Sequence, residues 1–169
     1  LNTITCIACQ SSGAKTYGLL AGHGTNVFNW LGSYMEFTQD GTNTGIGFWI
    51  KNKAGDVNIE SSWFSNNDFA VVLGDGTDSA ITDVFRNVNI ENNSISVRVT
   101  GIKIYSTIDS FGASIKGNRL DKGAGAPGTT TGVELEDVIH HGLVVEDNTF
   151  GKLAALDTNI TNPGRINIY

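Results

Sequence analysis

The sequence predicts an all-β chain that folds as a right-handed parallel β-helix of about five to six coils. The chain has 21 glycines, 2 prolines and only 17% charged residues, a mix that favours strands and turns over helices. A strand-like motif also recurs with fixed internal spacing, and a second alternating segment lies between its copies. We treat residues 1–169 as one domain, with 1–14 as an incomplete first coil and 151–169 as the last. Because strand-like sequence begins directly at Leu1, we expect a fragment of a longer protein.

The main repeat consists of two apolar residues separated by one residue. Copies begin at Val57, Val88, Ala113 and Leu143, which lie 31, 25 and 30 residues apart, and Met35-Glu36-Phe37 is a weaker copy. Alternation with a period of two indicates a strand with one buried face. If each copy stacks on the next, at a spacing of about 4.8 Å, backbone hydrogen bonds join the coils and loops absorb the variable lengths.

A second strand is predicted in each coil. Thr-Gly followed by alternating apolar residues begins at Thr44, Thr100 and Thr131, and Phe69-Ala70-Val71 fits the same slot without the Thr-Gly. Two short strands per coil therefore build the predicted stack.

An asparagine position follows the first strand at a constant offset. Asn93, Asn118 and Asn148 occupy it, with Ser62 as a weaker member. Asparagine tolerates left-handed backbone, and its amide can bond its own copy in the next coil. Asparagine is also simply a common turn residue, but the fixed offset favours a ladder of stacked side chains.

The charge and the cysteines narrow the functional classes. The net charge of −6 makes nucleic acid an unsuitable partner, and no apolar run reaches membrane-spanning length, so we expect no membrane insertion. Cys6 and Cys9 form a CxxC motif, but redox chemistry requires a helix start and the flanking residues are typical of a strand. We therefore expect two reduced thiols and no disulfide framework.

Two glutamates are the candidate catalytic residues. Alternation places Glu60 and Glu91 on the outer face, one coil apart and about 5 Å from each other, as in a retaining glycosidase pair. Mutual repulsion would raise the pKa of one carboxyl group, which suits a general acid. The alternative is a merely solvated outer face, with Lys116 neutralising the pair. Asp68, like Asp40 and Asp75, is placed in or beside a turn and is a weaker candidate.

The outer face of the second strand series has an aromatic and apolar character. Trp49, Val72 and Tyr105 are predicted to align as an exposed stripe beside Lys103. Such a stripe binds either a neighbouring subunit or a sugar ring, and Val72 favours a subunit.

Other candidates are weaker. Trp30 and Trp63 are placed at coil corners, with sugar stacking as the alternative. His140 and His141, near Asp137, lack a further convergent ligand, so no metal and no cofactor is predicted.

The alternation of Val-x-Ile-Glu-x-Asn-x-(Phe/Ile) with Thr-Gly-Ile-x-Ile, across roughly residues 15 to 150, resembles the pectate-lyase-like β-helix superfamily. Within it, the Gly-rich and Ser/Thr-rich turns are most similar to bacteriophage tailspike proteins. This resemblance implies a homotrimer on the virion surface, outside cells, that binds and often cleaves bacterial surface polysaccharide. The aspartate cluster that holds calcium in pectate lyases is missing. A free polysaccharide lyase, hydrolase or epimerase and an inactive structural shaft remain the alternatives.

Overall fold

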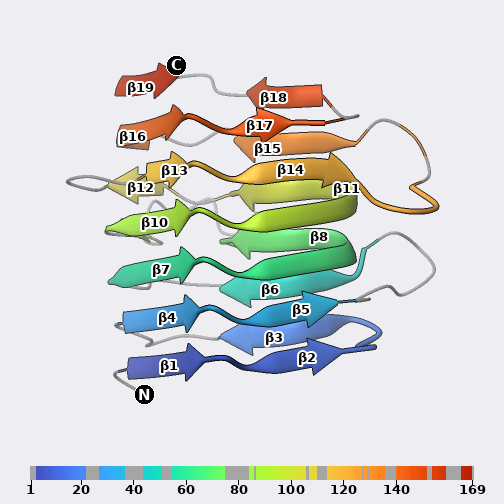
Figure 1. The fold of residues 1–169 in the computed structure, drawn as a ribbon. Helices are drawn as coiled ribbons and strands as arrows, with labels where there is room; N and C mark the ends of the chain where they lie inside the picture. Colours follow the sequence, from blue (N-terminus) through green and yellow to red (C-terminus); the bar gives the residue numbers. More distant parts are fainter. Residues whose placement is uncertain are drawn as a thin grey trace.

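The computed structural model describes residues 3–21, 27–36, 44–50, 55–74, 84–85, 87–105, 107–109, 114–126, 128, 130–135, 140–151, 154–158 and 165–168. In these ranges all regular structure is β, arranged as nineteen strands. The strands stack from β1 at the bottom of the view to β19 at the top (Figure 1). Parallel pairing of each strand with its copy in the next coil confirms the predicted all-β parallel solenoid.

The first track of the solenoid is the sheet that carries the main sequence repeat. Its strands, each parallel to the next, are β1 (Thr3–Ile7), β4 (Val27–Leu31), β7 (Asp56–Glu60), β10 (Val88–Glu91), β13 (Ser114–Lys116), β16 (His140–Glu146) and β19 (Arg165–Ile168). The short strands β9 (Val84–Phe85) and β12 (Thr107–Asp109) extend this sheet beside β16.

Each full coil contains three strand segments and not the two predicted. The second track comprises β2 (Gln10–Ser12), β5 (Tyr34–Glu36), the first parts of β8 (Trp63–Leu73) and β11 (Ser94–Ile104), β14 (Arg119–Lys122) and β17 (Thr149–Phe150). The third track comprises β3 (Tyr17–Ala21), β6 (Ile46–Ile50), the second parts of β8 and β11, β15 (Thr131–Leu135) and β18 (Ala154–Thr158). The second track was missed because its strands are short and follow the first track after only two residues.

The core is the column of inward side chains along the coil interior. The predicted inward residues of the four main copies that the structure describes are all buried, and these are Val57, Ile59, Val88, Ile90, Ile115, Leu143 and Val145. The weaker copy at Met35 was misplaced: Met35 belongs to β5 of the second track, and Phe28 and Trp30 hold the corresponding first-track positions. Ala113 lies outside the described residues. Trp30 belongs to this core and not to a corner, since it is 2% exposed and packs against Phe48, whose ring also contacts Phe28 at 4.5 Å.

The Thr-Gly signature has a packing reason at Thr100 and Thr131. The predicted copy at Thr44 is two residues out of register, because Ile46 and not Thr44 pairs with Phe69, which pairs in turn with Thr100. Thr100 pairs with Thr131, which brings Gly101 against Gly132 in the next coil. A Cβ atom on Gly101 would lie 2.6 Å from the Gly132 carbonyl oxygen and 2.6 Å from Leu120 Cδ2. Glycine is therefore required for the coils to approach closely at this position.

The cysteines form a disulfide, so the expectation of two reduced thiols is wrong. Cys6 and Cys9 are bonded, with their Cα atoms 5.8 Å apart. Cys6 is the last inward residue of β1, and the corner at Ala8, with φ of 54°, turns Cys9 back towards the interior. Both sulfur atoms therefore meet on the inside of the first coil. A tight corner, and not only a helix start, can therefore bring the two cysteines of a CxxC motif together.

Candidate functional site

The first corner, between the first and second tracks, carries a buried ladder of hydrogen bonds. At each rung a backbone N–H donates to a side-chain oxygen in the following coil. The bonds are Cys9 N to Ser33 Oγ (3.0 Å), Ser33 N to Ser62 Oγ (3.1 Å), Ser62 N to Asn93 Oδ1 (2.9 Å), Asn93 N to Asn118 Oδ1 (3.0 Å) and Asn118 N to Asn148 Oδ1 (3.0 Å). The four residues proposed from the sequence thus belong to one inner ladder, which also includes Ser33.

The amide groups of the inner ladder bond in the opposite direction as well. Asn93 Nδ2 donates to Ile59 O at 2.9 Å, and Asn118 Nδ2 donates to Ile90 O at 2.7 Å. The left-handed backbone, however, belongs to the residue before each rung, and these residues are Ala8, Gly32, Ser61, Asn92, Gly117 and Asp147. Asparagine is therefore used at the rungs for its hydrogen-bonding groups and not for its tolerance of positive φ. With rungs such as Asn93 and Asn118 only 1–2% exposed, this ladder is structural.

A second asparagine ladder, which the sequence analysis did not identify, runs along the outer face of the first track. Asn89 Nδ2 donates to Asn58 Oδ1 (2.9 Å), Asn58 Nδ2 to Asn29 Oδ1 (2.8 Å), and Asn29 Nδ2 to Thr5 Oγ1 (3.1 Å). The signal was present in the Val-Asn-Ile copies at Asn58 and Asn89. We call this set the outer ladder.

Glu60 and Glu91 lie where the sequence places them. They are direct register partners in β7 and β10, and both are half-buried on the outer face. The Ser114 hydroxyl in the next coil donates to Glu91 Oε1. A catalytic role for the pair stays a prediction.

Lys116 pairs with the following coil and not with the preceding glutamates. Its Nζ lies 2.6 Å from Glu146 Oε1 and 3.8 Å from Asp147 Oδ2. The hydrogen bond to Glu146, together with the charge of that carboxylate, raises the pKa of Lys116. Lys116 is the register partner of both Glu91 and Glu146, and its ion pair is with Glu146.

The stripe expected on the third track differs from the prediction in register and in exposure. Trp49 does oppose Val72, but the next partner of Val72 is Lys103, while Tyr105 lies two residues further along. Val72 is only 1% exposed, because Trp49 Nε1 donates to Gly74 O at 2.7 Å and the indole extends across this part of β8. Lys103 Nζ bonds Glu134 Oε1 at 2.6 Å and lies 4.5 Å from the centre of the Tyr105 ring. A subunit-contact role for this cluster stays a prediction, but it is not an open apolar stripe.

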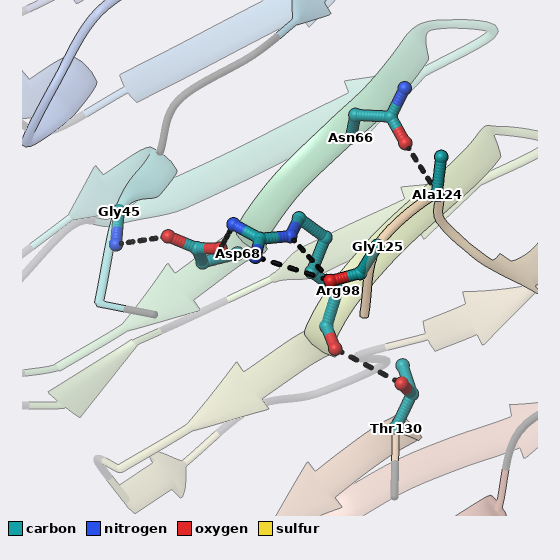
Figure 2. Close-up of polar contacts among 7 residues, drawn as sticks. All are labelled: Gly45, Asn66, Asp68, Arg98, Ala124, Gly125 and Thr130. Carbon is teal, nitrogen blue, oxygen red and sulfur yellow. Dashed lines mark hydrogen bonds and ion pairs between the residues drawn. The ribbon is translucent and has the colours of Figure 1, made fainter. Parts of the chain in front are cut away.

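Asp68 lies within β8 at the second corner, two residues after the left-handed Asn66, and it forms a buried ion pair (Figure 2). Its Oδ1 atom is 2.7 Å from Arg98 Nη1, its Oδ2 accepts from Gly45 N at 2.9 Å, and its side chain is 0% exposed. Arg98 also donates to Gly125 O at 3.2 Å through Nη2, and Thr130 Oγ1 donates to Arg98 O at 3.0 Å. We call Asp68 and Arg98 the corner latch, since they tie the second corner, between the second and third tracks, across several coils. This use of both carboxylate oxygens makes Asp68 structural.

Several weaker candidates lie outside the described residues. They are Asp40, Asp75 and Asp137, together with the side chains of His140 and His141, whose backbone belongs to β16. Within the described ranges, no group of three or more His, Cys, Asp or Glu residues could hold a metal ion. Those ranges also contain no helix long and apolar enough to cross a membrane.

An exposed aromatic pair occupies the outer face of the second track. Trp63 is 54% exposed, and its ring lies 5.1 Å from that of Tyr34 at an interplanar angle of 71°. The Tyr34 hydroxyl donates to Glu36 Oε2, and Ser12 Oγ donates to Glu36 Oε1 at 2.9 Å. The hydrogen bond to Glu36 raises the pKa of Tyr34, with burial and the carboxylate charge acting in the same direction.

Small hydroxyl side chains continue this face in the next coils. Trp63 opposes Ser94, and Ser65 opposes both Glu36 and Ser96. We call Tyr34, Glu36, Trp63, Ser65, Ser94 and Ser96 the aromatic-serine face. The corner predicted for Trp63 is wrong: Trp63 is the first residue of β8, and alternation from the inward Phe64 places its side chain outside.

Comparisons of the chain with protein-family models, with curated proteins and with solved structures found no match. The fold and the geometry of these faces therefore carry the functional argument.

Proposed function

We propose that this chain is a polysaccharide-recognising β-solenoid of the tailspike type, and that it binds bacterial surface glycan on the aromatic-serine face. The observation that carries this proposal is the exposed Trp63 ring, fixed on a sheet beside Tyr34. Burial of an aromatic ring is favourable, so a tryptophan with 54% exposure on a regular strand favours a binding role. Aromatic faces stack on sugar rings, and neighbouring hydroxyl and carboxylate groups supply hydrogen bonds.

The disulfide supports an extracellular location. Disulfides persist in oxidising environments such as the outside of cells and virion surfaces, and are rare in the cytosol. The Cys6–Cys9 bond is therefore in keeping with the virion-surface location that the resemblance implies. The homotrimer belongs to the same proposal and rests on the resemblance alone.

A second candidate function is cleavage of the bound glycan by Glu60 and Glu91. Their register pairing supports a carboxylate separation of about 5 Å, which fits a retaining mechanism. Glu60 and Trp63 flank the same corner, Ser61-Ser62, so a glycan seated on the aromatic-serine face would pass beside the glutamate pair. A free enzyme of this fold would differ from a tailspike in oligomeric state. A structural shaft without activity would differ in that it does not bind glycan.

Binding is tested by titrating the chain with a panel of bacterial capsular and O-antigen polysaccharides under calorimetry. We expect Trp63→Ala to weaken binding at least about tenfold, since stacking on an aromatic ring contributes on the order of 1 kcal/mol or more. Leu20→Ala is the matched control, because Leu20 is 47% exposed but lies on the third track. Equal effects of the two variants, or no binding by any polysaccharide, would contradict the proposal.

Cleavage is tested separately by following the release of reducing ends. We expect Glu60→Gln and Glu91→Gln to abolish release while leaving binding intact. Glu146→Gln, which changes a carboxylate of the same track outside the pair, should leave release unchanged. Full activity in both pair variants would remove Glu60 and Glu91 from the mechanism.

A further inference from the structure

Resting on the proposed glycan-binding function, we infer that the aromatic-serine face binds a sugar residue that carries a positively charged amino group, seated against Trp63 and the Glu36 carboxylate. Three features of the face point to this chemistry: its hydrogen-bonding capacity, its rings and its charge.

Both oxygens of the Glu36 carboxylate already accept a hydrogen bond from a hydroxyl group. Ser12 Oγ donates to one oxygen of Glu36, and the Tyr34 hydroxyl donates to the other. An ionised carboxylate offers about four lone-pair sites, so each Glu36 oxygen can accept a further bond. A tyrosine phenol is protonated at neutral pH, and the hydrogen bond to Glu36 raises the pKa of Tyr34 further, so Tyr34 remains a donor to Glu36. Glu36 therefore presents acceptor sites on this face, and a ligand group bound against it must supply donors.

An ammonium group is the ligand group that matches these acceptors. It has three N–H donors and no acceptor. Tryptophan is the best aromatic partner for a cation, and two rings inclined at 71° offer a ring face together with a ring edge. A neutral sugar would stack on Trp63 but would leave the charge of Glu36 unmatched.

The charge along the face disfavours an acidic sugar at this position. Along the register of the second track, the first cation after Trp63 is Arg119, two strands away at about 10 Å. Glu36, by contrast, lies two residues from Tyr34 on the same strand and face. The chain as a whole is acidic, with a net charge of −6. An anionic substituent would therefore be repelled beside Trp63, while a cationic one would be attracted.

The inference is tested with two oligosaccharides of the same sugar backbone: the glucosamine hexamer, whose amino groups are free, and the N-acetylglucosamine hexamer, whose amino groups are acetylated and uncharged. Each is titrated into the full chain at neutral pH and low salt, with calorimetry as the readout. We expect the glucosamine hexamer to bind at least about tenfold more tightly, with the preference falling as salt rises. Glu36→Gln keeps an oxygen that accepts from Tyr34 but removes the charge, so it should reduce the preference to about threefold or less.

The outcomes separate this inference from the proposed function. If the two hexamers bind equally, or if neither binds, the cationic specificity is wrong. A preference that persists in Glu36→Gln also overturns it. The proposed function fails instead if no polysaccharide of the panel binds, or if Trp63→Ala weakens binding no more than Leu20→Ala does. Glu146→Gln serves as the charge-matched control, because Glu146 lies on the first track and should not alter the preference.

Discussion

The two described corners of each coil are built in opposite ways. The first corner repeats one solution, in which a residue with positive φ is followed by an inner-ladder rung, from Ala8-Cys9 to Asp147-Asn148. The second corner changes from coil to coil, with a left-handed Asn66 in β8, register shifts between β8 and β11, and the corner latch. A repeated corner ties all coils to a common geometry. A variable corner can accept insertions such as residues 123–130, provided that individual contacts hold them.

The corner latch gives the largest expected effect. Arg98→Met would leave the Asp68 carboxylate buried without its cation, and this should destabilise the chain by about 3–5 kcal/mol in urea unfolding. The double variant Arg98→Met, Asp68→Asn should recover part of the loss, because the buried charge is then gone. A loss below about 1 kcal/mol would place Arg98 among ordinary surface ion pairs.

The inner ladder gives the next largest effect. Asn118→Ala removes the acceptor for Asn93 N and Asn93 Nδ2, and leaves Ile90 O without its donor. Buried groups without partners, together with the small cavity, should reduce the free energy of unfolding by about 2–4 kcal/mol. The measurement is again urea unfolding followed by circular dichroism. A loss of unfolding free energy as small as that for an exposed asparagine would show that the inner ladder does not stabilise the stack of coils.

The outer ladder provides that comparison and the smallest expected effect. Asn58→Ala also removes bonds to two neighbouring asparagines, Asn29 and Asn89. Asn58 is half-buried, so water can replace much of what is lost, and we expect a change below about 1 kcal/mol. If Asn58→Ala and Asn118→Ala cost the same, burial is not what separates the two ladders.

Repetition explains which parts of the fold could be predicted. Inward pairs such as Val57 and Ile59 recur at fixed offsets, as do the rungs at Asn93 and Asn118. The sequence therefore shows several copies of the same structural position, which can be compared with one another. The Glu60–Glu91 pairing followed from that register. Features that occur once had no copy to compare. The Asp68–Arg98 contact joins residues 30 positions apart, which is one coil, but the repeated motifs contain no copy of either residue.

The candidate site was less predictable for a related reason. Trp63 follows the first corner immediately and begins the second-track part of β8. In other coils the second-track strands are only three to four residues long, as in β5 and β14. Segments of that length carry too few alternations to assign a face. The Tyr105 error has a similar origin, because the outward position opposite Val72 belongs to Lys103 once the third-track register is fixed.

The inner ladder has a direction, and this direction bears on how the chain is made. At every described rung the backbone N–H of one coil donates to a side chain of the coil that follows it. During synthesis from the N-terminus, the newest corner therefore carries a buried N–H whose acceptor has not yet emerged from the ribosome. Each coil completes its predecessor, and stability accumulates one coil behind the growing end.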